Sequence, residues 1–396
     1  MAHIVIVGGG TSGLPMAYQM ADFARAEDRV TVVANREKFR CAPHAPWIPA
    51  PGTGYGALEF APAPGLEKKG IAFIGAGARR LHPERNQLEL GDGAALDYDF
   101  LVIAAGPTPA FDEIEGLGPD GFTQSICRPD HLPGCARAWA QFLAEPGAIL
   151  VGAVQGASCF APAYESAFRI DADLRRRALR DRSSMTFVTS EPCIGDLGLG
   201  GMADSRSLLE RELRERRIDW IIDARVSKVE KGLMHVTGHD EAGSPEKQYL
   251  LPFKYALMMP PFRGIDAVSG IEGLANERGF ILVDQFQRNP KYRNIYAAGV
   301  TVASATANAV LVPMDSPKTA YMVESMVEAT AQNIREQIDG REPSHSATWT
   351  AVSLADLGGP GLAFIAQQEP PQRKTDWYAE GDWVHMSRCS ACDVGG

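Results

Sequence analysis

The thiol groups are the side chains of this chain that most suggest chemistry. Cys159 stands in "GAVQGASCF", where a loop that begins like a dinucleotide-binding loop carries a cysteine instead of continuing with glycines. A thiolate is a nucleophile that exchanges sulfur with disulfides and polysulfides, and a nearby cation or helix N-terminus lowers the pKa of such a thiol. The position of Cys159 therefore predicts sulfur chemistry where a second nucleotide would otherwise bind.

Cys389 and Cys392 form a C-x-x-C pair that only four residues follow. This spacing is typical of half a zinc site or of a redox pair, and no second half of a zinc site is visible, so we predict no bound metal. We favour a mobile redox pair that exchanges sulfur or electrons with a partner. An incidental pair is the alternative.

The cysteine count argues against a disulfide framework. The chain has 396 residues and seven cysteines, an odd number, and it shows no export signal. Free cysteines are usually small core residues, and we expect this of Cys135 and Cys193.

A dinucleotide-binding unit opens the chain and must position the site. "HIVIV" predicts a strand buried on both faces of a parallel sheet, and a helix and the strand "RVTVV" follow. Gly8, Gly10 and Gly13 form G-x-G-x-x-G between the first strand and the helix. The first glycine allows the tight turn, the second lets a pyrophosphate approach the backbone, and the third lets the helix pack on the sheet. This pattern predicts a bound dinucleotide.

Other features favour FAD over NAD in this unit. The acidic residue that normally ends the second strand and binds ribose is Ala34 here, followed by Asn35 and Arg36. Buried strands at 98–107 and 294–303 resemble the elements that flank FAD in flavoproteins with two dinucleotide domains. The first ends in Ala105-Gly106 and the second in Gly299, with a valine where such proteins usually have aspartate.

A second strand–loop–helix–strand unit occupies the middle of the chain. Its loop reads Gly152-x-x-x-Gly156, with Val154 and Gln155 where the backbone should approach a pyrophosphate. We therefore expect a nucleotide-type domain that has lost, or retains only weakly, NAD(P)H binding. Periodic apolar residues after Thr319 predict a long helix whose N-terminus points toward the flavin.

These patterns predict an α/β fold with two Rossmann-like nucleotide-binding domains and a C-terminal α+β region. The expected divisions are 1–110 and 286–330 for the two parts of an FAD-binding domain, 111–285 for the degenerate NAD-type domain, and 331–396 for the C-terminal region with its mobile C-x-x-C tail.

Composition and charge limit the partners and the location. Apolar residues make up 45% and charged residues 22%, as in soluble globular proteins, and the formal net charge of −10 excludes nucleic acid and anionic membrane surfaces as partners attracted by charge. No signal peptide and no apolar run of about 18 residues is visible. We expect a location in the cytoplasm or peripherally on a membrane surface, and the oligomeric state is left open.

Several motifs together resemble the sulfide:quinone oxidoreductases and their relative, flavocytochrome c sulfide dehydrogenase. The resemblance runs from Met1 to about His385. Its motifs are the glycine loop, "QSICRPDH", "GASCFAPAYE", "TSEP", "VPMDSPKTAYMVESM" and "ATWTAVSLAD". It implies FAD in the first domain, two cysteines that pass sulfur beside the flavin, and electron transfer in pairs from sulfide, or from a small persulfide or thiol, to quinone.

The resemblance assigns roles to several cysteines and exposes one departure. Cys159 matches the family cysteine nearest the flavin, and Cys127 matches a second one that is usually outside the innermost pair. The third family cysteine belongs in "TAVSLAD", where this chain has Ser353, and a serine cannot form a disulfide or a persulfide. Cys159 then works alone or with Cys127, or Cys41 replaces the missing thiol, or the C-terminal pair swings in. The remaining alternative is that the site has diverged from the family and that sulfide is no longer the substrate.

The family match also nominates proton acceptors and cofactor contacts. Glu165 and His131 are candidate proton acceptors, whereas a second family histidine is replaced by Asp196. Lys318 is expected to face the flavin and to stabilise its anion. The residues expected to contact FAD are Gly8, Gly10, Thr11, Ser12, Gly13, Asn35, Arg36, Pro43, Ala78, Ala105, Gly106, Gly299 and Lys318.

The electron acceptor is the least determined part of this function. Family members that reduce quinone usually continue past "WVH" with amphipathic helices at the membrane interface, whereas this sequence stops at "DWVHMSRCSACDVGG". Quinone is the acceptor that the family implies, and a cytochrome or another protein acceptor is the alternative. A redox-sensing or partner-binding flavoprotein without turnover and, more weakly, an NADH oxidoreductase are the other hypotheses.

Overall fold

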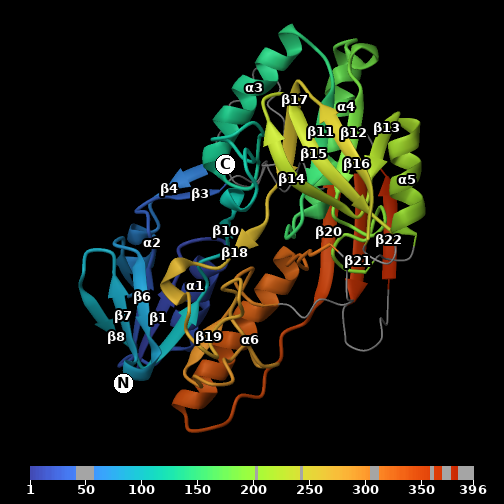
Figure 1. Ribbon diagram of the computed structural model, residues 1–396. Helices are drawn as coiled ribbons and strands as arrows, with labels where there is room; N and C mark the ends of the chain where they lie inside the picture. Colours follow the sequence, from blue (N-terminus) through green and yellow to red (C-terminus); the bar gives the residue numbers. More distant parts are fainter. Residues whose placement is uncertain are drawn as a thin grey trace.

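The computed structural model describes residues 1–41, 58–200, 204–240, 244–303, 312–356, 361–367 and 376–381. Two parallel sheets, each with its own helices, lie side by side along the molecule (Figure 1). No helix among these described residues is long and apolar enough to cross a bilayer.

The first parallel sheet has the strand order β19-β9-β1-β2-β5. Its strands are β1 (His3–Val7), β2 (Arg29–Val33), β5 (Ala72–Ile74), β9 (Phe100–Ile103) and β19 (Ile295–Ala297). Every residue of β1 is buried, as the apolar run "IVIV" predicts for a strand covered on both faces. The helices α1 (Gly13–Phe23) and α6 (Ala320–Ile338) pack against each other beside this sheet.

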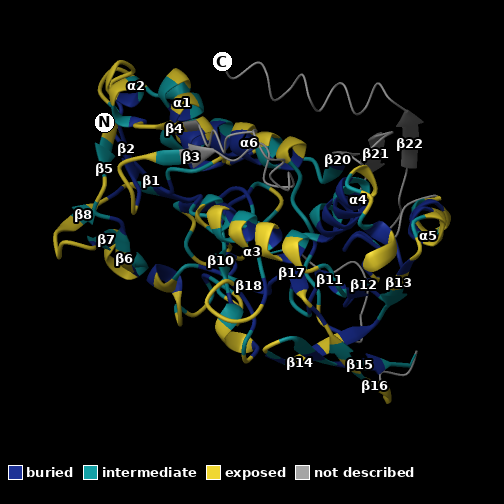
Figure 2. Cartoon of the chain, turned by 90° about the horizontal axis from the view of Figure 1, so that it is seen from above, coloured by how far each residue is buried: buried dark blue, intermediate teal, exposed yellow. Residues whose placement is uncertain are grey.

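The second parallel sheet has the order β13-β12-β11-β17 and belongs to the middle of the chain. Its strands are β11 (Ile149–Ala153), β12 (Met185–Thr189), β13 (Ile218–Ile221) and β17 (Tyr255–Met259), and its helices are α3 (Leu132–Ala144), α4 (Phe160–Arg176) and α5 (Ser205–Glu215). Helix α4 follows β11 directly and packs back on it, which is the arrangement of a Rossmann unit. Figure 2 shows mainly buried strands here, with exposed residues along the outer sides of α3 and α5.

Smaller elements complete the chain. The antiparallel sheets are β14 (Ala224–Glu230), β15 (Leu233–His239) and β16 (Pro245–Pro252); β6 (Ala78–His82), β7 (Gln87–Leu90) and β8 (Ala95–Asp97); and β20 (Thr350–Asp356), β21 (Gly361–Gln367) and β22 (Asp376–Gly381). The pairs are β3 (Phe39–Cys41) with β4 (Leu58–Phe60), and β10 (Thr108–Pro109) with β18 (Phe262–Arg263). The short helices are α2 (Ala63–Glu67) and the 3₁₀ turns Pro83–Arg85, Phe111–Glu113, Pro129–His131, Arg180–Arg182 and Asp266–Val268.

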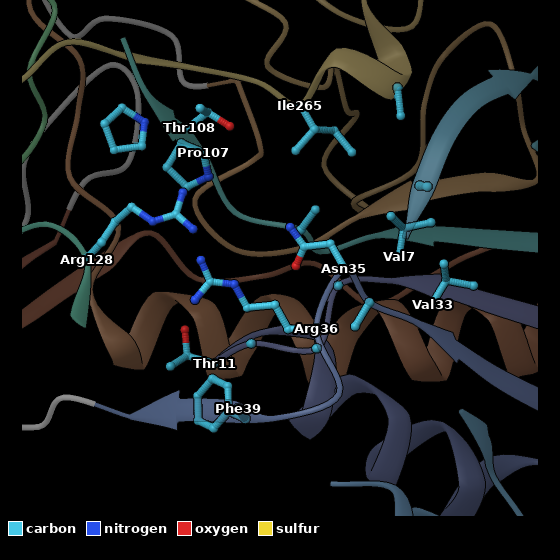
Figure 3. Close-up of a pocket in the computed structure, with 18 of the residues that line it drawn as sticks. Val7, Thr11, Val33, Asn35, Arg36, Phe39, Pro107, Thr108, Arg128 and Ile265 are labelled. Carbon is cyan, nitrogen blue, oxygen red and sulfur yellow. The ribbon is translucent and has the colours of Figure 1, made fainter. Parts of the chain in front are cut away.

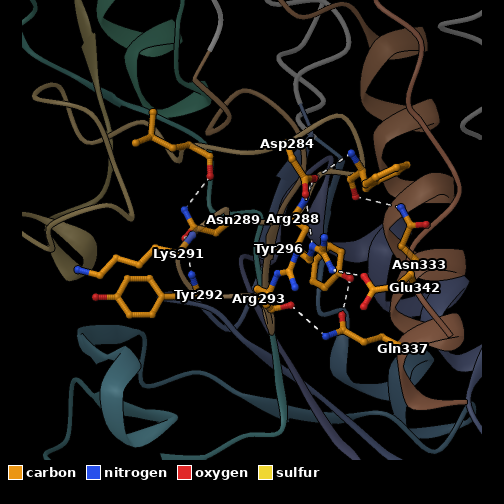
Figure 4. Close-up of polar contacts among 12 residues, drawn as sticks. Asp284, Arg288, Asn289, Lys291, Tyr292, Arg293, Tyr296, Asn333, Gln337 and Glu342 are labelled. Carbon is orange, nitrogen blue, oxygen red and sulfur yellow. Dashed lines mark hydrogen bonds and ion pairs between the residues drawn. The ribbon is translucent and has the colours of Figure 1, made fainter. Parts of the chain in front are cut away.

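A polar network fixes α6 to the returning strand β19. Tyr296 donates from its hydroxyl to Gln337 Oε1 at 2.7 Å, and Asn333 donates from its side chain to the carbonyl of Phe286 at 2.9 Å (Figure 4). Arg288, in the same segment, forms ion pairs with Asp284 and Glu342. These bonds hold the long helix in place.

The structure confirms the predicted fold class and the predicted long helix. Two parallel sheets with crossover helices form the two Rossmann-like units, and α6 begins directly after Thr319, whose hydroxyl accepts a capping bond from Met322 N. The C-terminal region continues from α6 into the antiparallel strands β20 to β22. The domain divisions stay predictions, and the second parallel sheet falls within the predicted 111–285.

Candidate active site

A cavity of about 780 Å³ lies at the carboxyl end of the first parallel sheet (Figure 3). Ligands of open α/β sheets bind at this edge. Of the predicted cofactor contacts, Gly8, Gly10, Thr11, Asn35, Arg36, Ala78 and Ala105 line the cavity, and Cys127 lines it as well. The cavity therefore brings most of the predicted nucleotide contacts together with one of the predicted sulfur residues.

The glycine loop has the shape that a dinucleotide needs. A Cβ at Gly8, whose φ is +130°, would lie 2.3 Å from the carbonyl oxygen of Ala104, and one at Gly13 would lie 1.9 Å from that of Gly8. A Cβ at Gly10 would instead project into open space, with the ring of Phe39 as its nearest neighbour at 4.0 Å. The first and third glycines are thus required by packing, whereas the second leaves room for a ligand. These residues fit the pyrophosphate of FAD.

Positive charge prevails on the same cavity, because Arg36, Lys38 and Arg128 line it against one carboxylate, Asp266. Figure 3 shows the side chains of Arg36 and Arg128 pointing toward one another. Arg36 also forms an ion pair with Asp130 at 2.7 Å, which joins the end of β2 to the segment that carries Cys127. Because Ala34 replaces the usual acidic residue, the positively charged lining of the cavity favours an anionic cofactor.

We expect Arg36→Ala to weaken FAD binding by about three- to ten-fold, since it removes one cation and one partly exposed ion pair. Fluorescence titration of the deflavinated protein measures this. Arg217→Ala is the matched control, because Arg217 forms an equally short ion pair with Asp181, at 2.6 Å, in the second unit. Equal FAD affinity in wild type and Arg36→Ala would contradict the assignment.

Two thiols meet beside this cavity. Cys127 and Cys159 lie close enough for each thiol to be the main cause of the shift in the other's pKa, and both side chains are half-buried. Cys127 Sγ also lies 3.8 Å from Met259 Sδ, at the end of β17. Cys159 ends the loop between β11 and α4, whereas Cys127 belongs to the connection into the second unit, so their approach depends on the tertiary fold.

The two thiols differ in acidity. The hydrogen bond with Cys127, helped by a bond from Ser158, holds the pKa of Cys159 below its ordinary value in spite of burial. The same hydrogen bond, together with burial, raises the pKa of Cys127 well above its ordinary value. Cys159 is also the N-cap residue of α4, where the helix dipole favours an anion. Cys159 is therefore the thiol that ionises first.

A third segment reaches the sulfur site from the N-terminus of α6. Asp315 N donates to the carbonyl of Ala157 at 2.9 Å, and Gly156 N donates to that of Pro313. Lys318, directly before the helix cap, is half-buried, and burial lowers the pKa of its ammonium while the nearby Asp315 opposes this shift. The predicted lysine thus lies in a segment that is hydrogen-bonded to the loop before Cys159.

The remaining predicted residues are placed as follows. His131 contacts the ring of Phe111, and burial lowers its pKa. Glu165 is buried on α4, 3.8 Å from Arg169 of the same helix, so it is not a surface residue. Ser12 and Gly299 lie against each other, since a Cβ at Gly299 would be 2.1 Å from Ser12 Oγ. Cys41 ends β3. Gly106 follows β9 without lining the cavity, and Pro43, Cys389 and Cys392 lie outside the described residues.

Cys135 and Cys193 were expected in the core, and the expectation is right only for the first. Cys135 is buried, its thiol donates to the carbonyl of Ser125 at 3.1 Å, and burial raises its pKa to about 11. Cys193 is half-buried because it sits in the loop after β12 instead of on a core-facing element.

Gln155 stands in the nucleotide-type loop of the second unit, and its side chain is held by backbone groups of β14. Its side chain donates to Val226 O at 2.8 Å and accepts from Val226 N at 3.0 Å, so it pairs like a strand residue with the edge of β14. These bonds tie the nucleotide-type loop of the second unit to β14, and the loss of NAD(P)H binding stays a prediction.

Sequence reasoning missed Glu191, although "TSEP" contains it. Its carboxylate is fully buried and accepts three hydrogen bonds, from Leu197 N at 2.7 Å, the Tyr164 hydroxyl at 2.9 Å and the Thr189 hydroxyl at 2.7 Å. Burial nevertheless raises its pKa to about 7 from an ordinary 4.5. An acid at the end of the second strand of a Rossmann unit was the available signal.

We expect the stability of the wild type to fall, relative to Glu191→Gln, as pH rises through about 7. A raised pKa means that the folded state favours the protonated acid. The contribution of Glu191 to the free energy of unfolding is therefore complete below pH 4.5 and is lost as pH rises through about 7. The relative change reaches at most about 3 kcal/mol. Denaturant unfolding of both proteins between about pH 5.5 and about pH 8.5 measures about 2 kcal/mol of this change. A difference between the two proteins that does not change with pH would contradict this.

Comparisons with known proteins agree with this geometry. A family model described as pyridine nucleotide-disulphide oxidoreductase matches residues 2–132. The sulfide-quinone reductase of Aquifex aeolicus (strain VF5) is 31% identical over 385 residues, which cover 97% of this chain and 87% of that protein. The mitochondrial sulfide:quinone oxidoreductase of Mus musculus is 22% identical over 308 residues, covering 75% of this chain and 65% of that protein.

A solved structure matches the fold over nearly the whole chain. The X-ray structure of the sulfide:quinone oxidoreductase from the hyperthermophilic bacterium Aquifex aeolicus has a TM-score of 0.91 at 31% identity, and the match covers 98% of this chain and 89% of that one. Sequence and fold therefore point to the same relative.

Proposed function

The chain belongs to the sulfide:quinone oxidoreductase family, and from that membership we propose that it oxidises sulfide through the Cys127–Cys159 pair, with FAD in the neighbouring cavity and quinone as the acceptor. The contact between the two thiols at the edge of the cofactor cavity is the observation that carries this proposal. It supplies the second sulfur that Ser353 cannot supply.

The pair can perform the sulfur steps when its two sulfurs are joined as a disulfide. Hydrosulfide attacks one sulfur, the S–S bond breaks, and the products are a persulfide on one cysteine and a thiolate on the other. A second hydrosulfide takes the outer sulfur away as hydrogen disulfide, which leaves two thiolates. Restoring the disulfide requires the loss of two electrons, and FAD, when bound, is the acceptor for such electrons.

The surrounding residues favour these steps by stabilising negative charge on sulfur. Cys159 lies at the N-terminus of α4, and the segment that leads into α6 brings Lys318 to the same region. The N-terminus of α4 carries a positive dipole end, which stabilises a thiolate on Cys159, whereas the nearby carboxylate of Asp315 acts in the opposite direction. Cys159 is therefore the better leaving group, and Cys127 is the better carrier of the persulfide.

Anaerobic stopped-flow measurement of flavin bleaching on mixing with sulfide tests the proposal. We expect fast bleaching with sulfide and none with NADH, because Gln155 occupies the second nucleotide loop. Reoxidation by a soluble quinone, compared with reoxidation by a cytochrome in the same preparation, identifies the acceptor. A flavoprotein that sulfide does not bleach would refute the proposed activity.

A further inference from the structure

Glu191 stands at the position from which an acidic residue usually binds a nucleotide, but its carboxylate is not accessible to a nucleotide. In a dinucleotide-binding Rossmann unit, an acid after the second strand binds the ribose hydroxyls. Here that acid follows β12, but it is fully buried, and its oxygens accept bonds from the protein's own Tyr164, Thr189 and Leu197. The carboxylate that would bind a ribose therefore binds groups of the protein itself.

These bonds anchor the loop 194–199. Leu197 N donates directly to Glu191, and Gly195 N donates at 3.0 Å to the hydroxyl of Tyr164, which itself donates to Glu191. Two of the backbone amides of the loop therefore depend on one carboxylate. The buried side chains of Ile194, Leu197 and Leu199 hold the same loop in the core.

The other side of this loop packs against the segments next to Cys159. A Cβ at Gly198, whose φ is +70°, would lie 2.8 Å from Asp315 O, 2.9 Å from Pro317 Cδ and 3.2 Å from the ring of Phe160. Phe160 directly follows Cys159 and begins α4, and Asp315 is bonded to Ala157 just before it. The loop thus packs against both segments that flank Cys159.

We propose that Glu191 is a positioning residue for Cys159: through Tyr164 and Leu197 it holds the loop 194–199 against the first turn of α4 and the segment 315–317. The acid that binds ribose in a nucleotide domain serves here to fix the two segments that flank the nucleophilic thiol. This inference rests on the assignment of Cys159 in the proposed function.

The test follows alkylation of Cys159 by iodoacetamide in the reduced, FAD-containing protein, by peptide mass spectrometry. We expect Tyr164→Phe and Glu191→Leu to raise the rate about five-fold or more, the factor for about one lost hydrogen bond, because the loop loosens. Glu191→Gln should stay within about two-fold of the wild type, since its amide oxygen still accepts from Leu197 N. Tyr164→Phe keeps the stacking on Phe187, whose ring centroid lies 4.3 Å away.

Glu212→Leu is the matched control. Glu212 is a buried acid on α5 that pairs with Arg216 and makes no bond to the loop, so its loss should lower stability without changing Cys159 alkylation. The inference is overturned if Tyr164→Phe and Glu191→Leu alkylate at the wild-type rate, or if Glu191→Gln or Glu212→Leu accelerates alkylation as much as they do. Alkylation needs no sulfide turnover, so failure here and failure of the proposed function are separate results.

Discussion

Cys159→Ser should lower the rate of flavin reduction by sulfide about 10³-fold or more, as expected when a group that acts chemically is removed. A serine hydroxyl can neither form a disulfide nor carry a persulfide, and its oxygen does not ionise near neutral pH. Stopped-flow bleaching of the bound flavin at several sulfide concentrations measures the loss. FAD content should be unchanged, because Cys159 is not among the residues that line the cavity.

Cys135→Ser is the control for Cys159→Ser. Cys135 is a buried thiol on α3 that already donates to a carbonyl, and a serine hydroxyl can make the same bond. We expect this variant to reduce its flavin at close to the wild-type rate. A Cys159→Ser protein that keeps the full rate would remove the sulfur mechanism.

Cys127→Ser should lower the rate of flavin reduction by sulfide about 10²-fold or more. This substitution removes the only described thiol that lies close to Cys159. The oxidised wild type should contain a Cys127–Cys159 disulfide, which peptide mapping without reductant detects. In Cys127→Ser, Cys159 should remain free for alkylation. These two readouts together test whether Cys127 replaces the family cysteine that is Ser353 here.

Cys41 and the C-terminal pair are the other candidates to replace the family cysteine that is Ser353 in this chain. Cys41→Ser and a truncation that removes Cys389 and Cys392 should both keep the wild-type rate of flavin reduction. If one of these variants loses the rate while Cys127→Ser keeps it, the sulfur partner of Cys159 is that residue and the proposed pair is wrong.

The sequence alone determined the features that depend on neighbouring residues. Gly8, Gly10 and Gly13 predicted the nucleotide loop, because turn geometry and close packing restrict these positions over a few residues of chain. Apolar runs predicted the buried parallel strands, and the periodicity after Thr319 predicted α6. The motifs around Cys159 and Cys127 identified the family, and Gln155 already indicated a degenerate second nucleotide loop.

The tertiary structure decided which of these residues act together. Cys127 meets Cys159, Arg36 pairs with Asp130, and Glu191 becomes a buried anchor, and no local pattern contains any of these contacts. Each joins segments from different strands or loops, so it exists only after the two sheets and their connections have packed. The surroundings created by packing then set the chemistry, because desolvation raises the pKa of Glu191 while the neighbouring Cys127 and Ser158 lower that of Cys159.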